Sequence, residues 1–196
     1  MVTLRSVGVF CGSSSGHGDQ YLLAARSLGT LLAGERIELV YGGGRVGLMG
    51  TLADACLDAG GRVTGVIPVG LFRREVAHRG VTELHEVATM HERKALMYDR
   101  SDAFVALPGG LGTLDELAEV ATWSQLGLHA KPLVLLDVDG FWTSFTGLLD
   151  TMVGAGLLKQ ENRSLISVCP DASAALAHLR AAEVTYAEKW IDVEDR

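Results

Sequence analysis

The hydrophobic residues of this chain fall into two alternating patterns. Short runs that are almost continuously apolar are typical of strands buried on both faces. Segments with apolar residues at helical spacing lie between most of these runs. The runs predict strands at residues 6–10, 38–41, 62–67, 103–107, 133–137 and 165–168, with a further short strand at 83–87. The helical segments are residues 21–33, 48–59, 114–126, 141–153 and 172–181, and another that extends from Met90 to Arg100.

This alternation predicts an α/β fold in which a parallel sheet carries helices on both faces. We expect a single Rossmann-like domain with a sheet of about six to seven strands, spanning residues 1–181, followed by a C-terminal tail at residues 182–196. Residues 69–89 are charged and mixed in pattern, and they interrupt the alternation. We therefore expect a long loop there that contains only the short strand at 83–87.

The composition agrees with one globular domain. The chain has 196 residues, of which 48% are hydrophobic, and this excludes disorder as its dominant state. Its net charge of −7 argues against general nucleic-acid binding, which needs clustered lysine and arginine. The sequence has neither a signal-peptide pattern nor an apolar stretch long enough to span a bilayer. We therefore expect a cytoplasmic protein that does not contact membranes.

The cysteines and histidines do not indicate a metal site. Cys11, Cys56 and Cys169 lie far apart in the sequence, which argues against a disulfide framework or a zinc site. The six histidines form no pair at the spacing of a helical metal site. No metal is therefore expected.

Glycine is concentrated in three turns, at residues 11–16, 42–50 and 108–113, each between a predicted strand and a predicted helix. Ligands of open parallel sheets bind beyond the carboxyl ends of the strands, where these turns lie. Glycine lets the backbone approach a ligand closely, and the free amides at a helix N-terminus bind phosphate. The three turns together predict a site for a nucleotide or a sugar phosphate.

Two of these turns allow more than one interpretation. The glycines at 42, 44 and 47 have the spacing of a dinucleotide-binding turn, but the acidic residue expected at the end of the next strand is missing. Tight packing of helix against strand explains them equally well. The serines at 13–15 fit either a ligand contact or turn and capping chemistry, and we favour the ligand contact because one hydroxyl is enough for a cap.

Charged residues beside the third turn also have two interpretations. Thr113 and Glu116 have the spacing of a capping box, and on spacing alone we favour this structural role for Glu116. Glu119 lies on the same helix face, so the two carboxylates could instead support acid–base chemistry. Arg93 and Lys94 are typical of a solvated helix face, yet they could also reach the same edge of the sheet.

Two linked motifs carry a resemblance to a known family. Met90-His91-x-Arg93-Lys94, followed by Pro108-Gly109-Gly110-x-Gly112-Thr113-x-x-Glu116, resembles the paired signature of the LOG ("lonely guy") family of cytokinin riboside 5′-monophosphate phosphoribohydrolases. The resemblance extends over residues 6–158. Such proteins have often been labelled lysine decarboxylases, but this sequence has no identifiable lysine and aspartate set for pyridoxal phosphate.

The resemblance implies a role for individual residues. It implies that Arg93 and Glu116 form the catalytic pair and that no cofactor is needed. It further implies a phosphate cradle and additional substrate contacts. The cradle consists of Gly109, Gly110, Gly112 and Thr113, and the further contacts are Lys94, Glu75 and Thr122. Ser13 and Gly43, in the first two glycine turns, are also expected to bind substrate.

The expected reaction is hydrolysis of the N-glycosidic bond of an N6-modified adenosine 5′-monophosphate, and of AMP itself, to the free base and ribose 5-phosphate. The resemblance also implies a homodimer with the site near the subunit interface. An alternative function is a nucleotide-binding or sensor module of the same fold without catalysis. A binding module would need the glycine turns but not the combination of Arg93 and Glu116.

Overall fold

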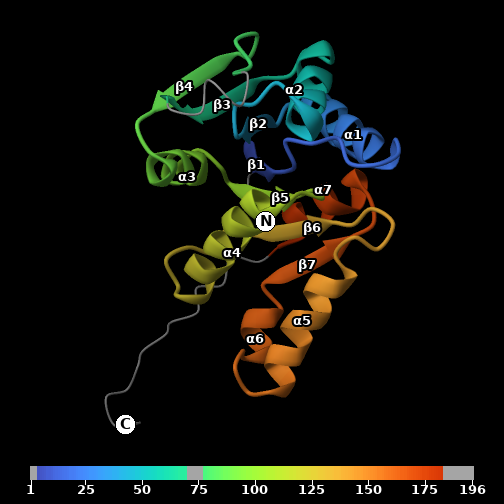
Figure 1. Ribbon diagram of the computed structural model, residues 1–196, viewed down its shortest axis with the longest axis vertical. Coiled ribbons are helices and arrows are strands. Elements are labelled where there is room, and N and C mark those ends of the chain that lie inside the picture. The colour runs from blue at the N-terminus through green and yellow to red at the C-terminus, as the bar shows by residue number, and fades with distance from the viewer. Residues whose placement is uncertain (1–3, 70–76, 183–196) are drawn as a thin grey trace.

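The computed structural model describes residues 4–69 and 77–182 (Figure 1). It contains one sheet of seven strands, in the order β4-β3-β2-β1-β5-β6-β7, and all neighbouring strands pair in parallel. The strands are β1 (Ser6–Phe10), β2 (Glu38–Tyr41), β3 (Val63–Pro68), β4 (Glu83–Val87), β5 (Ala103–Ala106), β6 (Leu133–Leu136) and β7 (Ile166–Cys169). The helices are α1 (Gln20–Gly34), α2 (Gly47–Asp58), α3 (Met90–Asp99), α4 (Leu111–Gln125), α5 (Thr143–Gly154), α6 (Gln160–Arg163) and α7 (Ala172–Ala181).

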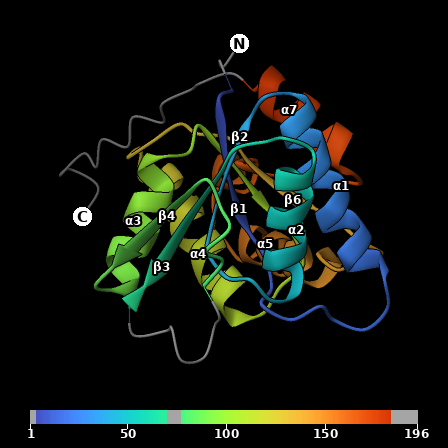
Figure 2. The same cartoon turned by 90° about the horizontal axis from the view of Figure 1, so that it is seen from above.

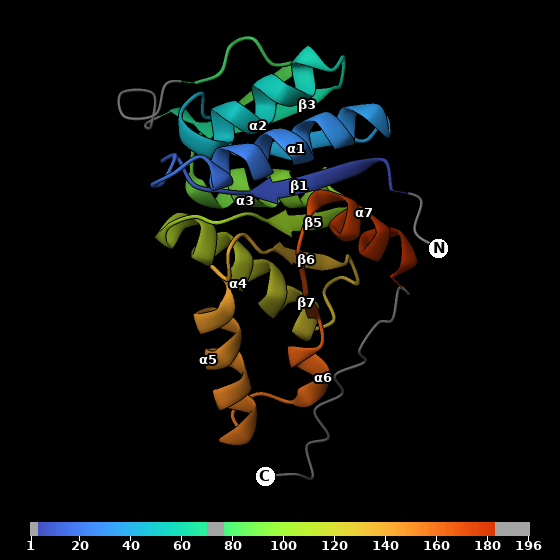
Figure 3. The ribbon, with the colours of Figure 1, turned by 90° about the vertical axis from the view of Figure 1, so that its right-hand side faces the viewer.

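Helices cover both faces of the sheet. The view from above shows α1, α2 and α7 on one side of the strands and α3 on the other (Figure 2). Each side has its own hydrophobic core, because the strands are apolar on both faces. Leu28 and Leu52 belong to the first core, and Met97 and Leu117, from α3 and α4, belong to the second. α5 and α6 lie beyond β7, at the edge of the sheet (Figure 3).

The order of the strands fixes where a ligand can bind. β1 lies at the centre of the sheet, and Val7 pairs with Leu39 of β2 on one side and with Ala103 of β5 on the other. The chain therefore adds β2, β3 and β4 on one side of β1 and then β5, β6 and β7 on the other. In open parallel sheets the crevice at such a switch point, beyond the carboxyl ends of the strands, is the usual ligand site.

The predicted fold class is confirmed, and the predicted strands differ from the observed ones by no more than a residue or two. The short strand at 83–87 is present as β4 at one edge of the sheet. Two helices differ from prediction, because α4 begins earlier than expected and the single turn of α6 was not predicted. No helix among residues 4–69 and 77–182 is both long and apolar enough to cross a membrane.

Candidate active site

The three glycine turns meet at the carboxyl edge of the sheet. The backbone N–H of Gly12, after β1, donates to the carbonyl of Pro108, after β5, at 3.2 Å. The N–H groups of Leu48 and Met49, at the start of α2, donate to the carbonyl of Gly12 at 3.1 and 3.3 Å. Turns that are far apart in the sequence are therefore joined by backbone hydrogen bonds into one framework.

The second glycine turn serves mainly close packing. Gly47 has a φ of +61°, and a Cβ at this position would overlap the backbone of Ser13. Gly43 has a φ of +75° and is packed against the backbone of Val66, so it is buried and does not line either of the cavities described below. Of the two interpretations of this turn, these contacts favour close packing, of Gly47 against the first glycine turn and of Gly43 against β3.

The third glycine turn opens toward free space. Gly110 is the N-cap of α4, and the N–H of Leu114 makes the first helical hydrogen bond, to the carbonyl of Gly110, at 3.1 Å. The N–H groups of Leu111, Gly112 and Thr113 therefore have no helical partner. A Cβ placed on Gly112 would meet no atom within 4 Å. This helix end has the geometry and the positive electrostatic potential that bind an anion.

The predicted capping box at Thr113 and Glu116 is wrong. Because α4 begins at Leu111, Thr113 lies inside the first turn, and the N-cap Gly110 has no side chain with which to cap. Glu116 lies in the second turn, where its carboxylate is too far along the helix to reach back to the N-cap. The carboxylate has a different partner.

That partner is Arg93. Its Nη1 lies 3.0 Å from Oε1 of Glu116, and the two side chains are only 10% and 8% exposed. Two further bonds fix the guanidinium, because Nε donates to the carbonyl of Val66 at 3.1 Å and Nη2 to the carbonyl of Gly42 at 3.2 Å. A buried charged pair with this many bonds is held in one orientation. Arg93 is therefore not part of a solvated helix face.

The ion pair lies in a cavity of about 210 Å³, named here the Glu116 cavity. It is lined by Cys11, Gly12, Ser13, Met49, Arg93, Gly110, Leu111, Gly112, Thr113 and Glu116. A second cavity of about 400 Å³ adjoins it and shares Gly12, Ser13 and Gly110 with it. The aromatic rings of Tyr21 and Phe141 line this second cavity, together with the serines at 13–15. Ser13 thus lies where the two cavities meet, as a substrate contact would.

Cys11 lines the Glu116 cavity but is not a nucleophile. Burial raises the pKa of its thiol well above the usual value, and the nearby carboxylate of Glu116 raises it further. A thiol must ionise to attack a substrate or bind a metal. Cys11 therefore remains neutral and contributes packing to the wall of the cavity.

Two further predicted contacts, Lys94 and Thr122, do not line the Glu116 cavity. Nζ of Lys94 is 3.1 Å from Oδ2 of Asp115 and 3.0 Å from Oε1 of Glu119, so this lysine joins α3 to the exposed side of α4. Thr122 is exposed on α4 and lines neither cavity. Glu75 lies outside the residues that the structure describes.

Backbone groups are the part of the site that the sequence did not indicate. The carbonyls of Gly42 and Val66 hold the guanidinium of Arg93, and a backbone carbonyl is present in every residue type. No pattern of side chains in the sequence therefore predicts the role of these two carbonyls. The only available signal was that Gly42 directly follows a strand and that Val66 lies in the second half of one.

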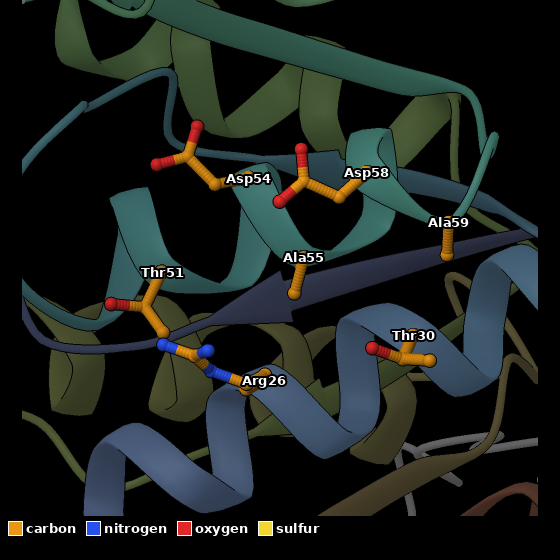
Figure 4. A pocket seen from close by; sticks show the side chains of 7 residues that line it. All are labelled: Arg26, Thr30, Thr51, Asp54, Ala55, Asp58 and Ala59. Carbon is orange, nitrogen blue, oxygen red and sulfur yellow. The ribbon is translucent and has the colours of Figure 1, made fainter.

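A larger cavity of about 560 Å³ lies elsewhere, between α1 and α2. Figure 4 shows its lining, with Arg26 and Thr30 on α1 and Thr51, Asp54 and Asp58 on α2. It is formed by the outer sides of two helices rather than by strand ends, and none of the predicted site residues that the structure describes lines it. The candidate active site is therefore the Glu116 cavity.

The strand order and the site at the carboxyl edge define a Rossmann-like α/β protein. Solved structures share this fold. The molybdenum cofactor carrier protein of Chlamydomonas reinhardtii aligns with a TM-score of 0.68 and 23% identity, over 90% of this chain and 96% of that one. The molybdenum cofactor binding protein of Rippkaea orientalis aligns with a TM-score of 0.68 and 23% identity, over 92% and 98%. At these identities the likeness concerns the fold alone.

Sequence relatives identify the family. A family model described as "possible lysine decarboxylase" matches residues 49–179. A cytokinin riboside 5′-monophosphate phosphoribohydrolase of Rhodococcoides fascians is 48% identical, over 91% of this chain and 91% of its own length. The enzyme of that name from Oryza sativa subsp. japonica, LOG, is 49% identical over 86% of this chain and 69% of its own. The chain belongs to this family, the LOG phosphoribohydrolases.

The site does not fit the decarboxylase description. Amino-acid decarboxylation with pyridoxal phosphate needs a lysine that forms a Schiff base with the cofactor. Among the residues that the structure describes, no lysine lines the Glu116 cavity or the cavity beside it. Lys94, the lysine of the motif, is bound to two carboxylates.

Proposed function

We propose that this protein hydrolyses the N-glycosidic bond of N6-modified adenosine 5′-monophosphates, and of AMP, to the free base and ribose 5-phosphate. The observation that carries the proposal is the buried pair of Arg93 and Glu116, in one cavity with the free amides of α4. The names of the sequence relatives support the same reaction. Anion-binding amides beside a fixed carboxylate fit a substrate that has a phosphate at one end and a glycosidic bond near the carboxylate.

The reaction needs a negative charge beside the sugar. When the bond from C1′ to the base breaks, its electron pair leaves with the base and positive charge develops on C1′ and O4′. The carboxylate of Glu116 stabilises this cation and accepts a proton from the attacking water. The water oxygen forms the new bond to C1′, and the departing base gains a proton overall.

Arg93 acts on the carboxylate. Its three bonds leave little freedom to the guanidinium, so Glu116 is held in one position. The N-terminus of α4 contributes less, because Glu116 lies in the second turn and the effect of the helix dipole falls off within the first. The free amides of α4 bind the 5′-phosphate instead, with Gly109, Gly110, Gly112 and Thr113 forming the cradle.

Phosphate anchoring gives the test of the proposal. Binding energy from the phosphate is used to orient C1′ against Glu116, so a substrate without phosphate reacts poorly. Purified protein is incubated with AMP, with N6-prenylated AMP and with the matching nucleosides, and the free base is measured by chromatography. We expect base from the nucleotides and at least about 100-fold less from the nucleosides. Equal cleavage of nucleoside and nucleotide would refute the anchoring.

The same experiment separates this reaction from nucleotide binding without catalysis. A binding or sensor module would bind AMP, as measured by calorimetry, but would release no adenine. Comparison of kcat/KM for AMP and prenylated AMP then shows which base the enzyme prefers.

We also propose that the protein is a cytoplasmic homodimer with the site near the subunit interface. The dimer is supported by Leu111, which is 85% exposed at the edge of the Glu116 cavity. Exposed apolar residues beside a site are typical of surfaces that contact a partner. Sedimentation equilibrium tests the dimer, and a monomer that retains full activity would argue against a shared site.

A further inference from the structure

Gly42, at the end of β2, lies directly against the tip of Arg93. Its carbonyl accepts a hydrogen bond from Nη2 at 3.2 Å. A Cβ built on Gly42 would overlap this same Nη2 and would lie 3.0 Å from Cζ of Arg93, with Sδ of Met49 3.2 Å away. The space that a side chain would fill at position 42 is therefore occupied by the guanidinium.

The backbone at Gly42 does not itself require glycine. Its φ lies outside the left-handed region, unlike the φ of +75° at Gly43. A left-handed φ therefore does not exclude alanine at position 42. What excludes alanine is the position of Arg93, whose tip is the far end of a long side chain and can move more easily than backbone.

We propose that Gly42 is a positioning residue that fixes the guanidinium of Arg93 against Glu116, by its carbonyl and by its lack of a side chain. The expected loss of kcat rests on the proposed function, whereas the expected displacement of the guanidinium does not. Substitution of Gly42 by alanine moves Nη2 away, which breaks the bond to the carbonyl of Gly42 and misaligns Nη1 with Glu116. The fold tolerates the change, because the displaced group is the end of one side chain.

The first test compares Gly42→Ala with the wild type. We expect kcat for AMP to fall by at least about tenfold, with KM within about twofold, because misplacement of a catalytic group acts on the chemical step. We expect the melting temperature to stay within about 4 °C of the wild type. Gly34→Ala is the control, because a Cβ at Gly34 meets nothing within 4 Å, and it should leave kcat unchanged. An unchanged kcat in Gly42→Ala would overturn the proposal.

The second test asks whether Gly42 acts through Arg93. In an Arg93→Lys background the branch that carries Nη2 is absent, so adding Gly42→Ala should cost at most about twofold in kcat. Equal losses in both backgrounds would show a general structural role and overturn the inference.

The third test does not depend on activity. In the wild type the Nε–H of Arg93 is buried and bonded to Val66, so its NMR signal should exchange slowly with solvent. We expect faster exchange in Gly42→Ala but not in Gly34→Ala, and unchanged exchange would overturn the proposal. If the wild type released no base, the proposed function would fail while this readout still decided the role of Gly42.

Discussion

At the scale of residues, two adjacent cations in the first half of α3 lie in different environments, one in the cavity and one at the outer side of α4. Arg93 points into the Glu116 cavity, whereas Lys94 points to the outer side of α4 and contacts Asp115 and Glu119. Burial by itself would lower the pKa of Lys94, but its hydrogen bonds to the two carboxylates outweigh this, and the pKa is raised. Lys94 therefore stays protonated and joins the two helices that carry the ion pair.

Lys94→Met tests whether this lysine stabilises the packing of α3 against α4 or is the substrate contact that the family resemblance implies. Methionine keeps the apolar stem but removes the charge. We expect the free energy of unfolding to fall by about 1 kcal/mol, as for the loss of partly exposed ion pairs, and KM for AMP to stay within about twofold. Chemical denaturation and steady-state kinetics measure the two effects. A large rise in KM at unchanged stability would instead identify a substrate contact.

The sequence indicated which side chains meet in the Glu116 cavity better than it indicated their contacts. Glu116 was assigned a structural role on spacing, because a capping box needs only four neighbouring residues. Its real partner, Arg93, comes from another helix, and a contact between elements is not encoded in local spacing. The family motif placed Arg93 and Glu116 together, but no side-chain pattern indicates the two carbonyls that hold Arg93.

At the scale of elements, the start of α4 decides what the third glycine turn can bind. The helical pattern predicted a start near residue 114, because glycine has low helix propensity and the apolar spacing begins after the glycines. The helix begins at Leu111 instead, with Gly110 in an extended conformation as its N-cap. The free amides thereby belong to Leu111, Gly112 and Thr113, within the glycine-rich segment.

Gly112→Ala tests this arrangement. A Cβ at Gly112 meets no protein atom, and alanine favours the helix, so we expect stability to rise by up to about 1 kcal/mol. The methyl group would occupy space that we assign to the phosphate, so KM for AMP should rise about tenfold or more. Gly154→Ala, also in open space at the end of α5, is the matched control and should leave KM unchanged. Tight AMP binding by Gly112→Ala would place the phosphate elsewhere.

At the scale of the whole molecule, two cores on opposite faces of one sheet carry the stability. The alternation of apolar strands and amphipathic helices predicted this layering, because each element must bury its apolar surface. The order of the strands and the cavity at the switch point were not readable from that pattern. They depend on how turns at residues 12, 48 and 108 meet in space.

One buried histidine beside the second core makes the stability of the folded protein depend on pH. His129 is 5% exposed in the connection from α4 to β6. Its Nε2–H donates to the carbonyl of Val120 at 3.0 Å, and its Nδ1 accepts from the N–H of Lys131 at 3.0 Å, so the neutral ring satisfies both partners. Burial lowers its pKa in the folded protein from the ordinary value of 6.5. A protonated ring would lose the bond from Lys131.

The sign of the pH effect follows from this shift. Below pH 6.5 the unfolded chain binds a proton at His129 more readily than the folded protein does, so stability falls as the pH falls toward the folded pKa. We expect this residue to contribute a slope of at most about 1.4 kcal/mol per pH unit. Denaturation from pH 7.5 to 5 should show a smaller slope for His129→Gln than for the wild type. Identical slopes would exclude a contribution of His129.

We propose that the carboxylate of Glu116 promotes the attack of water on C1′ and so the cleavage of the glycosidic bond. Glu116→Gln preserves the size of the side chain and a hydrogen bond to Arg93 but removes the negative charge beside C1′. The most direct measurement is release of adenine from AMP by this variant, with AMP affinity determined by calorimetry on the same sample. We predict turnover lower by at least about 100-fold, with AMP affinity and melting temperature close to those of the wild type. Near-normal turnover in Glu116→Gln would contradict the account.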